Sequence, residues 1–400
     1  MPEPADRRPI ASPAFLIAMC CGFGFASYVS IYMRIPVVPL YAASLGADAA
    51  QVGLINATFL LTTGFLSFPF GLLSDRRGRK VLVTAGLLVS AVSAFLLCLS
   101  RTPAHLIAIY LLFGVGLAAV GPTLMSYVAD VSPAGYLGRS YGWYTMAIYS
   151  AMSVGPAIGG ALAEKLGFCS LFVISGGFVI VIAGLSFLIL PDIRLTPAHR
   201  HPSWNLRENL KRLLTNRQML GCWLATLGGC FGMGMFMTFL PLWAHERGLS
   251  LARIGLLFML QAAANALSRL PLGHLCDRPG SRVPLATVGL VSMGAFLGAF
   301  GLAHNFLHFL VLGIILGVGM GLTFTPLGAL IAEVASPELR GLAMGGYNTV
   351  IYLGMMLSSA LMGYVIELTG YPVSYLLAGL CLIILAPFSF RMMRSADPSR

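Results

Sequence analysis

Apolar residues occur along this chain in long runs that short polar segments separate. A helix needs about 20 consecutive apolar residues to cross the hydrocarbon core of a bilayer. The pattern predicts twelve runs of that kind, and hence an all-α membrane protein. We place the transmembrane helices at 13–43, 52–73, 81–99, 106–129, 140–163, 170–190, 219–244, 254–273, 285–303, 306–332, 341–367 and 373–390.

Only one polar connection is long, and it lies near the middle of the chain. It divides the sequence into a first domain at 1–190, a linker at 191–217 and a second domain at 218–400. Within the linker, Asn205 and Glu208 have the spacing of a helix capping box. Leucines and basic residues then alternate as on an amphipathic helix, which suits either a simple tether or a helix lying on the lipid surface.

Composition and charge support this picture. Hydrophobic residues make up 58% of the chain and charged residues 10%, with a mean hydropathy of +0.85, which is more apolar than a soluble domain needs. Nineteen of the 25 Lys and Arg residues fall on one side of the predicted helices. The positive-inside rule therefore places both termini in the cytoplasm. The net charge of +11 has this topological explanation, so we expect no nucleic-acid partner.

The eight cysteines fall mostly in apolar runs, among them Cys20, Cys98 and Cys222. Their spacing is not that of metal ligands. We expect them to be small core residues, and we expect neither a metal nor a cofactor.

A charged segment after the second apolar run returns in the second half of the chain. Gly71-Leu-Leu-Ser-Asp75-Arg-Arg-Gly78-Arg79-Lys80 is echoed, 202 residues later, by Gly273-His-Leu-Cys-Asp277-Arg-Pro-Gly280-Ser-Arg282. Other pairs repeat at a similar offset: Asp130 with Glu333, and Glu164 and Gly167 with Glu367 and Gly370. An internal repeat of this length predicts two pseudo-symmetric bundles of six helices each.

These residues resemble those of the major facilitator superfamily. The segment beginning at Gly71 is similar to that family's motif A, and Gly155-Pro156-Ala-Ile-Gly159-Gly160 is similar to motif C of its drug/proton antiporters. The resemblance implies the twelve-helix fold and alternating access. One position departs from the antiporter pattern, because Tyr110 stands where an arginine is usual. No Asp or Glu lies deep in a predicted helix either, which leaves proton coupling open.

The resemblance also implies a cytoplasmic gate. Asp75 would meet the amino terminus of the helix at 341–367, and Arg79 would reach Asp130. Asp277, Arg282 and Glu333 would repeat these contacts in the second half. The alternative is that the basic residues only fix the topology. Gly155, Pro156, Gly159 and Gly160 favour either a bending gate helix or close helix packing.

Polar residues inside the predicted helices are candidates for substrate binding. The four deep amides are Asn56, Gln261, Asn265 and Asn348. Tyr352 shares a helix face with Asn348, and Arg34 shares one with Ser27 and Ser30. An arginine in a span is costly and functional by default, so Arg34 and Arg269 favour an anionic substrate. Snorkelling of either side chain to the interface is the alternative.

We therefore expect a secondary transporter that exports amphipathic compounds, with anionic ones as candidates, from a bacterial inner membrane. Its expected partners are the substrate, the lipid bilayer and, as candidate coupling ions, protons, and we expect a monomer. Two alternatives are an ion-coupled uptake of an organic anion and a membrane sensor that transports nothing. An enzyme is not expected, because the seven histidines form no catalytic constellation.

Overall fold

The computed structural model describes residues 13–133, 136–191, 206–276, 278, 280–336 and 338–394, with the backbone alone at 13, 75, 76, 206 and 207. Within this part of the chain all regular structure is helical. The helices are α1 (Pro13–Arg34), α2 (Val38–Ser44), α3 (Ala49–Arg77), α4 (Arg79–Leu99), α5 (Pro103–Val131), α6 (Leu137–Ile189), α7 (Leu206–Thr215), α8 (Arg217–Glu246), α9 (Leu251–Cys276), α10 (Arg282–Ala299), the 3-10 helix η1 (Phe300–Leu302), α11 (Phe306–Val334) and α12 (Arg340–Met393).

Ten helices of the described ranges are long and apolar enough to cross a membrane. Two of them, α6 with 53 residues and α12 with 54, contain one glycine with non-helical backbone angles. Gly167 has a φ of 83° and Gly370 a φ of 75°, a conformation that residues with a Cβ rarely adopt. The sequence predicts helix boundaries between 163 and 170 and between 367 and 373, and the two glycines fall in these intervals.

One helix that the sequence predicts as continuous is interrupted in the structure. The sequence pattern favours a single helix over 13–43, whereas α1 ends at Arg34 and α2 begins at Val38. Pro36 and Pro39 lie at this break. Because proline lacks an amide N–H and clashes with the preceding turn, it ends a helix that hydropathy alone would continue.

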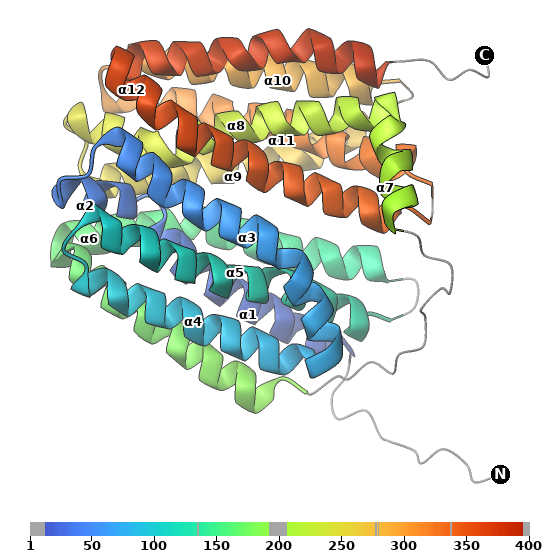
Figure 1. Ribbon diagram of the computed structural model, residues 1–400, viewed down its shortest axis with the longest axis horizontal. Coiled ribbons are helices and arrows are strands. Elements are labelled where there is room, and N and C mark those ends of the chain that lie inside the picture. Colours follow the sequence, from blue (N-terminus) through green and yellow to red (C-terminus); the bar gives the residue numbers. More distant parts are fainter. Residues whose placement is uncertain are drawn as a thin grey trace.

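The helices before residue 190 gather on one side of the molecule and those from residue 217 onwards on the other (Figure 1). We call the line between them the seam. We name the two ends of the molecule after the short helices found there, so that α2 lies at the α2 end and α7 at the α7 end.

The most extensive contacts across the seam are those of α3 with α12 and of α6 with α9, and α2 and α3 also contact α8. The contacts are closest near the α2 end, where a Cβ on Gly53 would lie 2.1 Å from the Ser359 carbonyl oxygen and a Cβ on Gly160 2.3 Å from that of Leu251. Towards the α7 end the ribbons of α3 and α12 draw apart (Figure 1). A Cβ on Gly71 or Gly345 would have nothing within 4 Å. The seam is therefore closed at the α2 end and loosens towards the α7 end.

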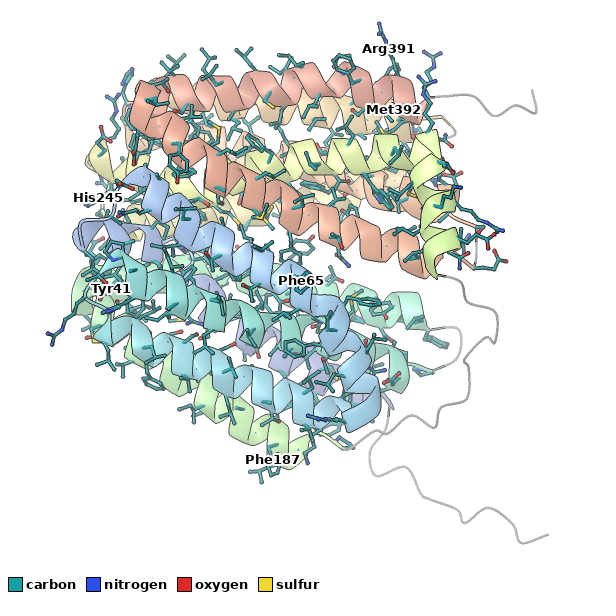
Figure 2. The ribbon with its side chains drawn as sticks, viewed as in Figure 1. Tyr41, Phe65, Phe187, His245, Arg391 and Met392 are labelled. Carbon is teal, nitrogen blue, oxygen red and sulfur yellow. A yellow bond between two sulfur atoms is a disulfide. The ribbon has the colours of Figure 1, made fainter. Side chains whose placement is uncertain are left out.

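Large apolar side chains cover the flanks of the molecule. Phe65 is 76% exposed and Phe187 55% exposed, and both point away from the helices in Figure 2. An apolar surface of this extent would be unfavourable in water, and it suits contact with lipid. In α7, Leu213 is buried while Arg212 pairs with Glu208 at the surface. The expected cap of α7, Asn205, lies outside the described residues.

The expectation that the cysteines are simple core residues is wrong at two positions, Cys98 and Cys169. Cys98, at the end of α4, forms a disulfide with Cys169 of α6, 71 residues away. The bond lies at the α2 end, where Tyr41 of α2 donates a hydrogen bond to the neighbouring Leu97 carbonyl. Hydropathy could not reveal it, because Cys98 also satisfies the pattern of a buried apolar residue. Cys20, Cys21, Cys222, Cys230 and Cys381 are free thiols.

Candidate functional site

A cavity lies in the seam between α1, α6, α8, α9 and α11. Three types of side chain line it, namely aromatic rings, methionines and amides. The lining residues include Tyr32, Tyr149, Met152, Met233, Phe236, Met237, Phe258, Gln261, Asn265 and Met320. Aromatic and thioether groups adapt to varied apolar ligands, while the two amides supply hydrogen bonds. We call this the central cavity.

Arg269 stands at the α7 side of the central cavity. Its guanidinium lies 4.4 Å from the ring centroid of Tyr149, and its Nε donates a hydrogen bond of 3.3 Å to Oδ1 of Asn265. The phenol of Tyr347 in α12 interacts electrostatically with both Arg269 and Tyr149. No carboxylate lines the central cavity in the part of the chain described here, so its nearest full charge is positive.

Tyrosines from three helices surround the same region. The rings of Tyr28 and Tyr32 in α1 are 6.2 Å apart, and Tyr32 is within electrostatic range of Tyr149 and Tyr352. Sequence reasoning found Tyr352 but missed Tyr32 and Tyr149. Tyr149 could have been found, because it precedes Pro156 by two helical turns on the same face of α6.

A second cavity of similar size crosses the seam nearer the α2 end. Its volume is about 30 Å³, and it is lined by Ile35, Asn56, Phe59, Leu60, Tyr110, Phe113, Gly234, Met237, Thr238 and Met355. Thr238 also shares a hydrogen bond of 2.8 Å with Ser359 of α12. We call this the upper cavity.

The structure brings together part of the predicted substrate site. Gln261 and Asn265 line the central cavity, and Asn56 lines the upper one. Tyr352 packs against the backbone at Gly64. Asn348 is exposed and lines neither cavity.

Arg34 occupies a different place from the one its helical stripe suggests. Ser30, on the same face of α1, hydrogen-bonds to Ser175 of α6, and the Arg34 guanidinium covers the ring of Phe113 in α5 at 4.7 Å. This stripe therefore faces neighbouring helices on its own side of the seam, and Tyr28 and Tyr32 form the face that meets the other side. Polar spacing cannot distinguish the two situations, because helices in a membrane also bond to one another through polar side chains.

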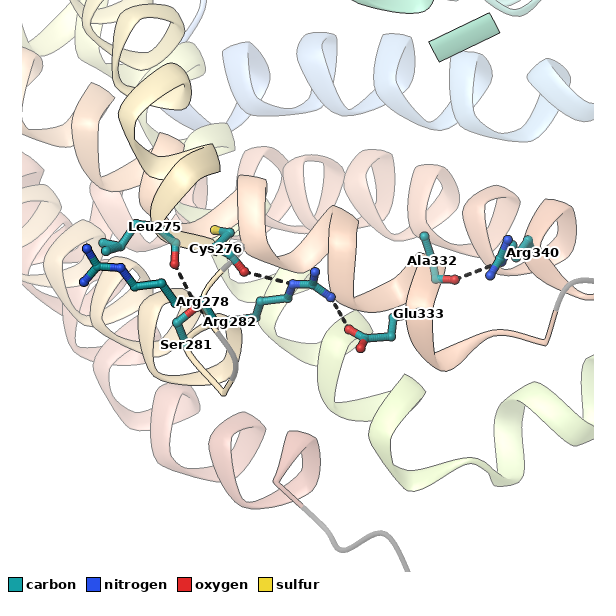
Figure 3. Close-up of polar contacts among 8 residues, drawn as sticks. All are labelled: Leu275, Cys276, Arg278, Ser281, Arg282, Ala332, Glu333 and Arg340. Atoms are coloured by element: carbon teal, nitrogen blue, oxygen red, sulfur yellow. Dashed lines mark hydrogen bonds and ion pairs between the residues drawn. The ribbon is translucent and has the colours of Figure 1, made fainter. Parts of the chain in front are cut away.

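Two ion pairs lie at the α7 end. Arg79 pairs with Asp130, and its Nη1 donates to Oγ of Ser74 at 2.9 Å. In the second half Arg282 pairs with Glu333, and its Nε donates to the Cys276 carbonyl at 3.2 Å (Figure 3). Both pairs join residues on the same side of the seam. The side chain of Asp75 and the whole of Asp277 lie outside the described part of the chain.

The glycines of α6 allow two helices to approach it closely. A Cβ on Gly155 would lie 2.8 Å from Cβ of Tyr32, and one on Gly159 would lie 2.0 Å from the Met33 carbonyl oxygen. Gly160 faces α9 in the same way. Backbone angles stay helical through Pro156, so in this conformation the segment packs closely and does not break.

Two carboxylates cross the seam at the α2 end. Glu164 Oε2 accepts a hydrogen bond of 2.7 Å from the backbone N–H of Ala252, at the amino terminus of α9. Glu367 Oε1 accepts one of 3.0 Å from the N–H of Ala50, at the amino terminus of α3. A carboxylate is stabilised at this end of a helix, because the first N–H groups lack partners and the macrodipole is positive there. The sequence repeat pairs these two glutamates but does not reveal their partners.

Sequence and structure comparisons agree with one another. The sequence profile of the Major Facilitator Superfamily matches residues 20–300 and again 222–400. An uncharacterized MFS-type transporter of Methanocaldococcus jannaschii is 25% identical over 368 residues, 92% of this chain and 95% of that protein. Multidrug resistance protein 1 of Bacillus subtilis is 25% identical over 82% of this chain and 83% of its own.

Shorter and more distant similarities exist as well. The quinolone resistance protein NorA of Staphylococcus aureus is 33% identical over 141 residues, 35% of this chain and 36% of that protein. Among solved structures, a bacterial homolog of the human lysosomal transporter Spinster, inward-facing and occupied, has a TM-score of 0.81 at 16% identity, with 96% of this chain and 99% of that one covered. The nucleoside transporter NupG has a TM-score of 0.81 at 14% identity, covering 95% of this chain and all of that one.

Proposed function

Because the chain belongs to the major facilitator superfamily, it is a multi-pass membrane transporter and not an enzyme, and we propose that it exports amphipathic, anionic compounds. One observation carries the choice of substrate. The central cavity is lined by aromatic and methionine side chains, with Arg269 beside it and no carboxylate among its described lining residues. An amphipathic anion can place its apolar body on the rings and its charge near the guanidinium.

The names of the relatives support export. The relative in B. subtilis is named for multidrug resistance and the one in S. aureus for quinolone resistance. A protein that removes varied compounds needs a site that adapts to them, and methionines and aromatic rings provide one. The proposal also includes a coupling ion, for which protons are the candidate, and an anionic group on the carried compound.

We further propose an architecture of twelve spans in two bundles, at 1–190 and 218–400, joined by the linker at 191–217. The division of α6 at Gly167 and of α12 at Gly370 supports this count. In this arrangement the α7 end faces the cytoplasm and the α2 end the periplasm of a bacterial inner membrane. The disulfide between Cys98 and Cys169 supports that orientation, because disulfides persist in the oxidising periplasm.

Transport would then proceed by alternating access. The α2 end is closed by Glu164 and Glu367, while the loosened α7 end would admit substrate from the cytoplasm. The ion pairs Arg79–Asp130 and Arg282–Glu333 would hold each loop in place, so that Asp75 and Asp277 can meet the opposite bundle when the α7 end closes. Gly155, Pro156, Gly159 and Gly160 would keep α6 close enough to α1 and α9 for the two bundles to rock against one another.

Everted membrane vesicles test this function. Vesicles that contain the protein should accumulate an anionic amphipathic dye such as carboxyfluorescein, and Arg269→Met should lower that accumulation at least tenfold. The matched control is Arg253→Met, which removes an arginine at the α2 end. A cationic dye serves for comparison. If the Arg269→Met variant accumulates each dye to the same extent as the wild type, the anion proposal is rejected.

A further inference from the structure

Arg34 is a buried cation whose donors are only partly satisfied. Its side chain is 3% exposed, and both Nε and Nη2 lack a hydrogen-bond partner. The carboxyl end of α1 and the face of Phe113 stabilise a positive charge. Neither of them accepts a hydrogen bond from Nε or Nη2 here. Buried donors without acceptors are rare in proteins, and each one calls for an explanation.

The position of the two free donors indicates what is missing. Nε–H and Nη2–H lie side by side on one edge of the guanidinium and point in the same direction. The two oxygens of a carboxylate match this edge and bind it through two parallel hydrogen bonds. The edge is therefore shaped for a small planar anion.

The described part of the chain does not supply that anion. None of the acidic side chains that the structure describes pairs with Nε or Nη2 of Arg34. They are Asp48, Asp130, Glu164, Glu208, Glu246, Glu333, Glu338 and Glu367. The acceptor for Arg34 must then come from outside these residues.

A cavity is lined by two residues that adjoin the Arg34 side chain. Phe113, whose ring Arg34 covers, and Ile35, its neighbour in sequence, both line the upper cavity. A cavity of about 30 Å³ exceeds what one water molecule needs. The lining of this cavity also contains polar groups, from Asn56, Tyr110 and Thr238.

We propose that Arg34 anchors a binding site for a small monovalent anion of the carboxylate type, separate from the central cavity. This inference goes beyond the transport proposal, because the site would be occupied whichever compound is carried. A carboxylate could reach it as a free small ion or as the head group of the carried compound. Formate and decanoate, tested separately, distinguish these two sources.

Thermal unfolding of the purified protein tests the site without any transport assay. At constant ionic strength, sodium formate should raise the unfolding temperature of the wild type by a few degrees in a saturable manner, relative to sodium HEPES. Arg34→Gln should abolish this rise, and Arg269→Gln should retain it. Arg34→Lys is a second variant for the case that Arg34→Gln does not fold, and it should also lose the rise because lysine lacks the paired donors.

Three results would overturn the inference. The first is a wild-type unfolding temperature that is the same in formate and in HEPES. The second is a formate effect that persists in both Arg34 variants. The third is stabilisation by decanoate but not by formate, which would assign Arg34 to the carried compound. A failure of dye export with the formate effect intact would refute the transport proposal alone.

Discussion

The two carboxylates that cross the seam should set the balance between the two end states of the transporter. Replacing Glu164 and Glu367 together by glutamine removes both charges from the helix amino termini while keeping the size of the side chains. The bonds to Ala252 and Ala50 exist only while the α2 end is closed. The double variant should therefore open at that end more often than the wild type.

The expected size of the change follows from the surroundings of the two groups. An anion at a helix amino terminus contributes about 0.3–1 kcal/mol when it is exposed and up to about 2 kcal/mol when it is partly buried. We take about 0.3 kcal/mol for an exposed group and about 1 kcal/mol for a partly buried one. The Glu164 bond is exposed and the Glu367 bond partly buried. The sum is about 1.3 kcal/mol, which is roughly a ninefold shift of the population ratio, since 1.4 kcal/mol is tenfold.

Distance measurements between spin labels can detect this shift. Arg101 and Leu302 are exposed at the α2 end on opposite sides of the seam, so cysteines at these positions would carry the labels. The double variant should gain a population at longer distance. The control is Glu246→Gln. Glu246 lies at the same end and makes no hydrogen bond across the seam among the described contacts, so this variant should not gain the longer-distance population. An unchanged distance distribution in the double variant would refute the assigned role.

Three further perturbations probe other parts of the molecule. Gly159→Ala would place a Cβ 2.0 Å from the Met33 carbonyl oxygen, and an overpacked contact costs about 1–3 kcal/mol. The purified variant should therefore unfold at a lower temperature than the wild type. An unchanged unfolding temperature would contradict the close approach of the two helices. Cys98→Ser should expose one new thiol, that of Cys169, to a membrane-impermeant maleimide applied to whole cells; labelling only after lysis would reverse the proposed topology. Asp130→Asn breaks an ion pair with an arginine that is 6% exposed, so we expect a loss of at least tenfold in dye export with the protein still inserted; full export would exclude a role in gating.

Prediction from the sequence was most successful for features that lie within one helix or at the ends of adjacent helices. Long apolar runs locate the spans, and the glycines at 167 and 370 fall where the hydropathy dips. The repeat and the family resemblance together predict the pairing of Arg79 with Asp130 and of Arg282 with Glu333, and both ion pairs are present. In each case the partners lie at the ends of adjacent helices, so sequence order nearly determines their proximity.

Prediction failed where proximity depends on how helices rotate and pack. The face of α1 that carries Arg34 is polar, but polarity does not say whether a face meets a cavity or another helix. The bond from Ala50 to Glu367 spans 317 residues, and nothing local to either residue indicates it. The Cys98–Cys169 disulfide joins the ends of two helices that meet only after folding. Such contacts need the three-dimensional arrangement.

The polar contacts at the two ends of the molecule differ in kind, and this difference bears on mechanism. At the α2 end, carboxylates on one side of the seam bind helix amino termini on the other, so opening must break these bonds. At the α7 end, the two described ion pairs join residues on the same side, so separation of the bundles leaves them intact. The pairs can therefore keep each loop ordered in both end states, whereas Glu164 and Glu367 contribute to only one. It follows that substitutions at Asp130 or Glu333 should disturb closure of the α7 end, and those at Glu164 or Glu367 should favour it.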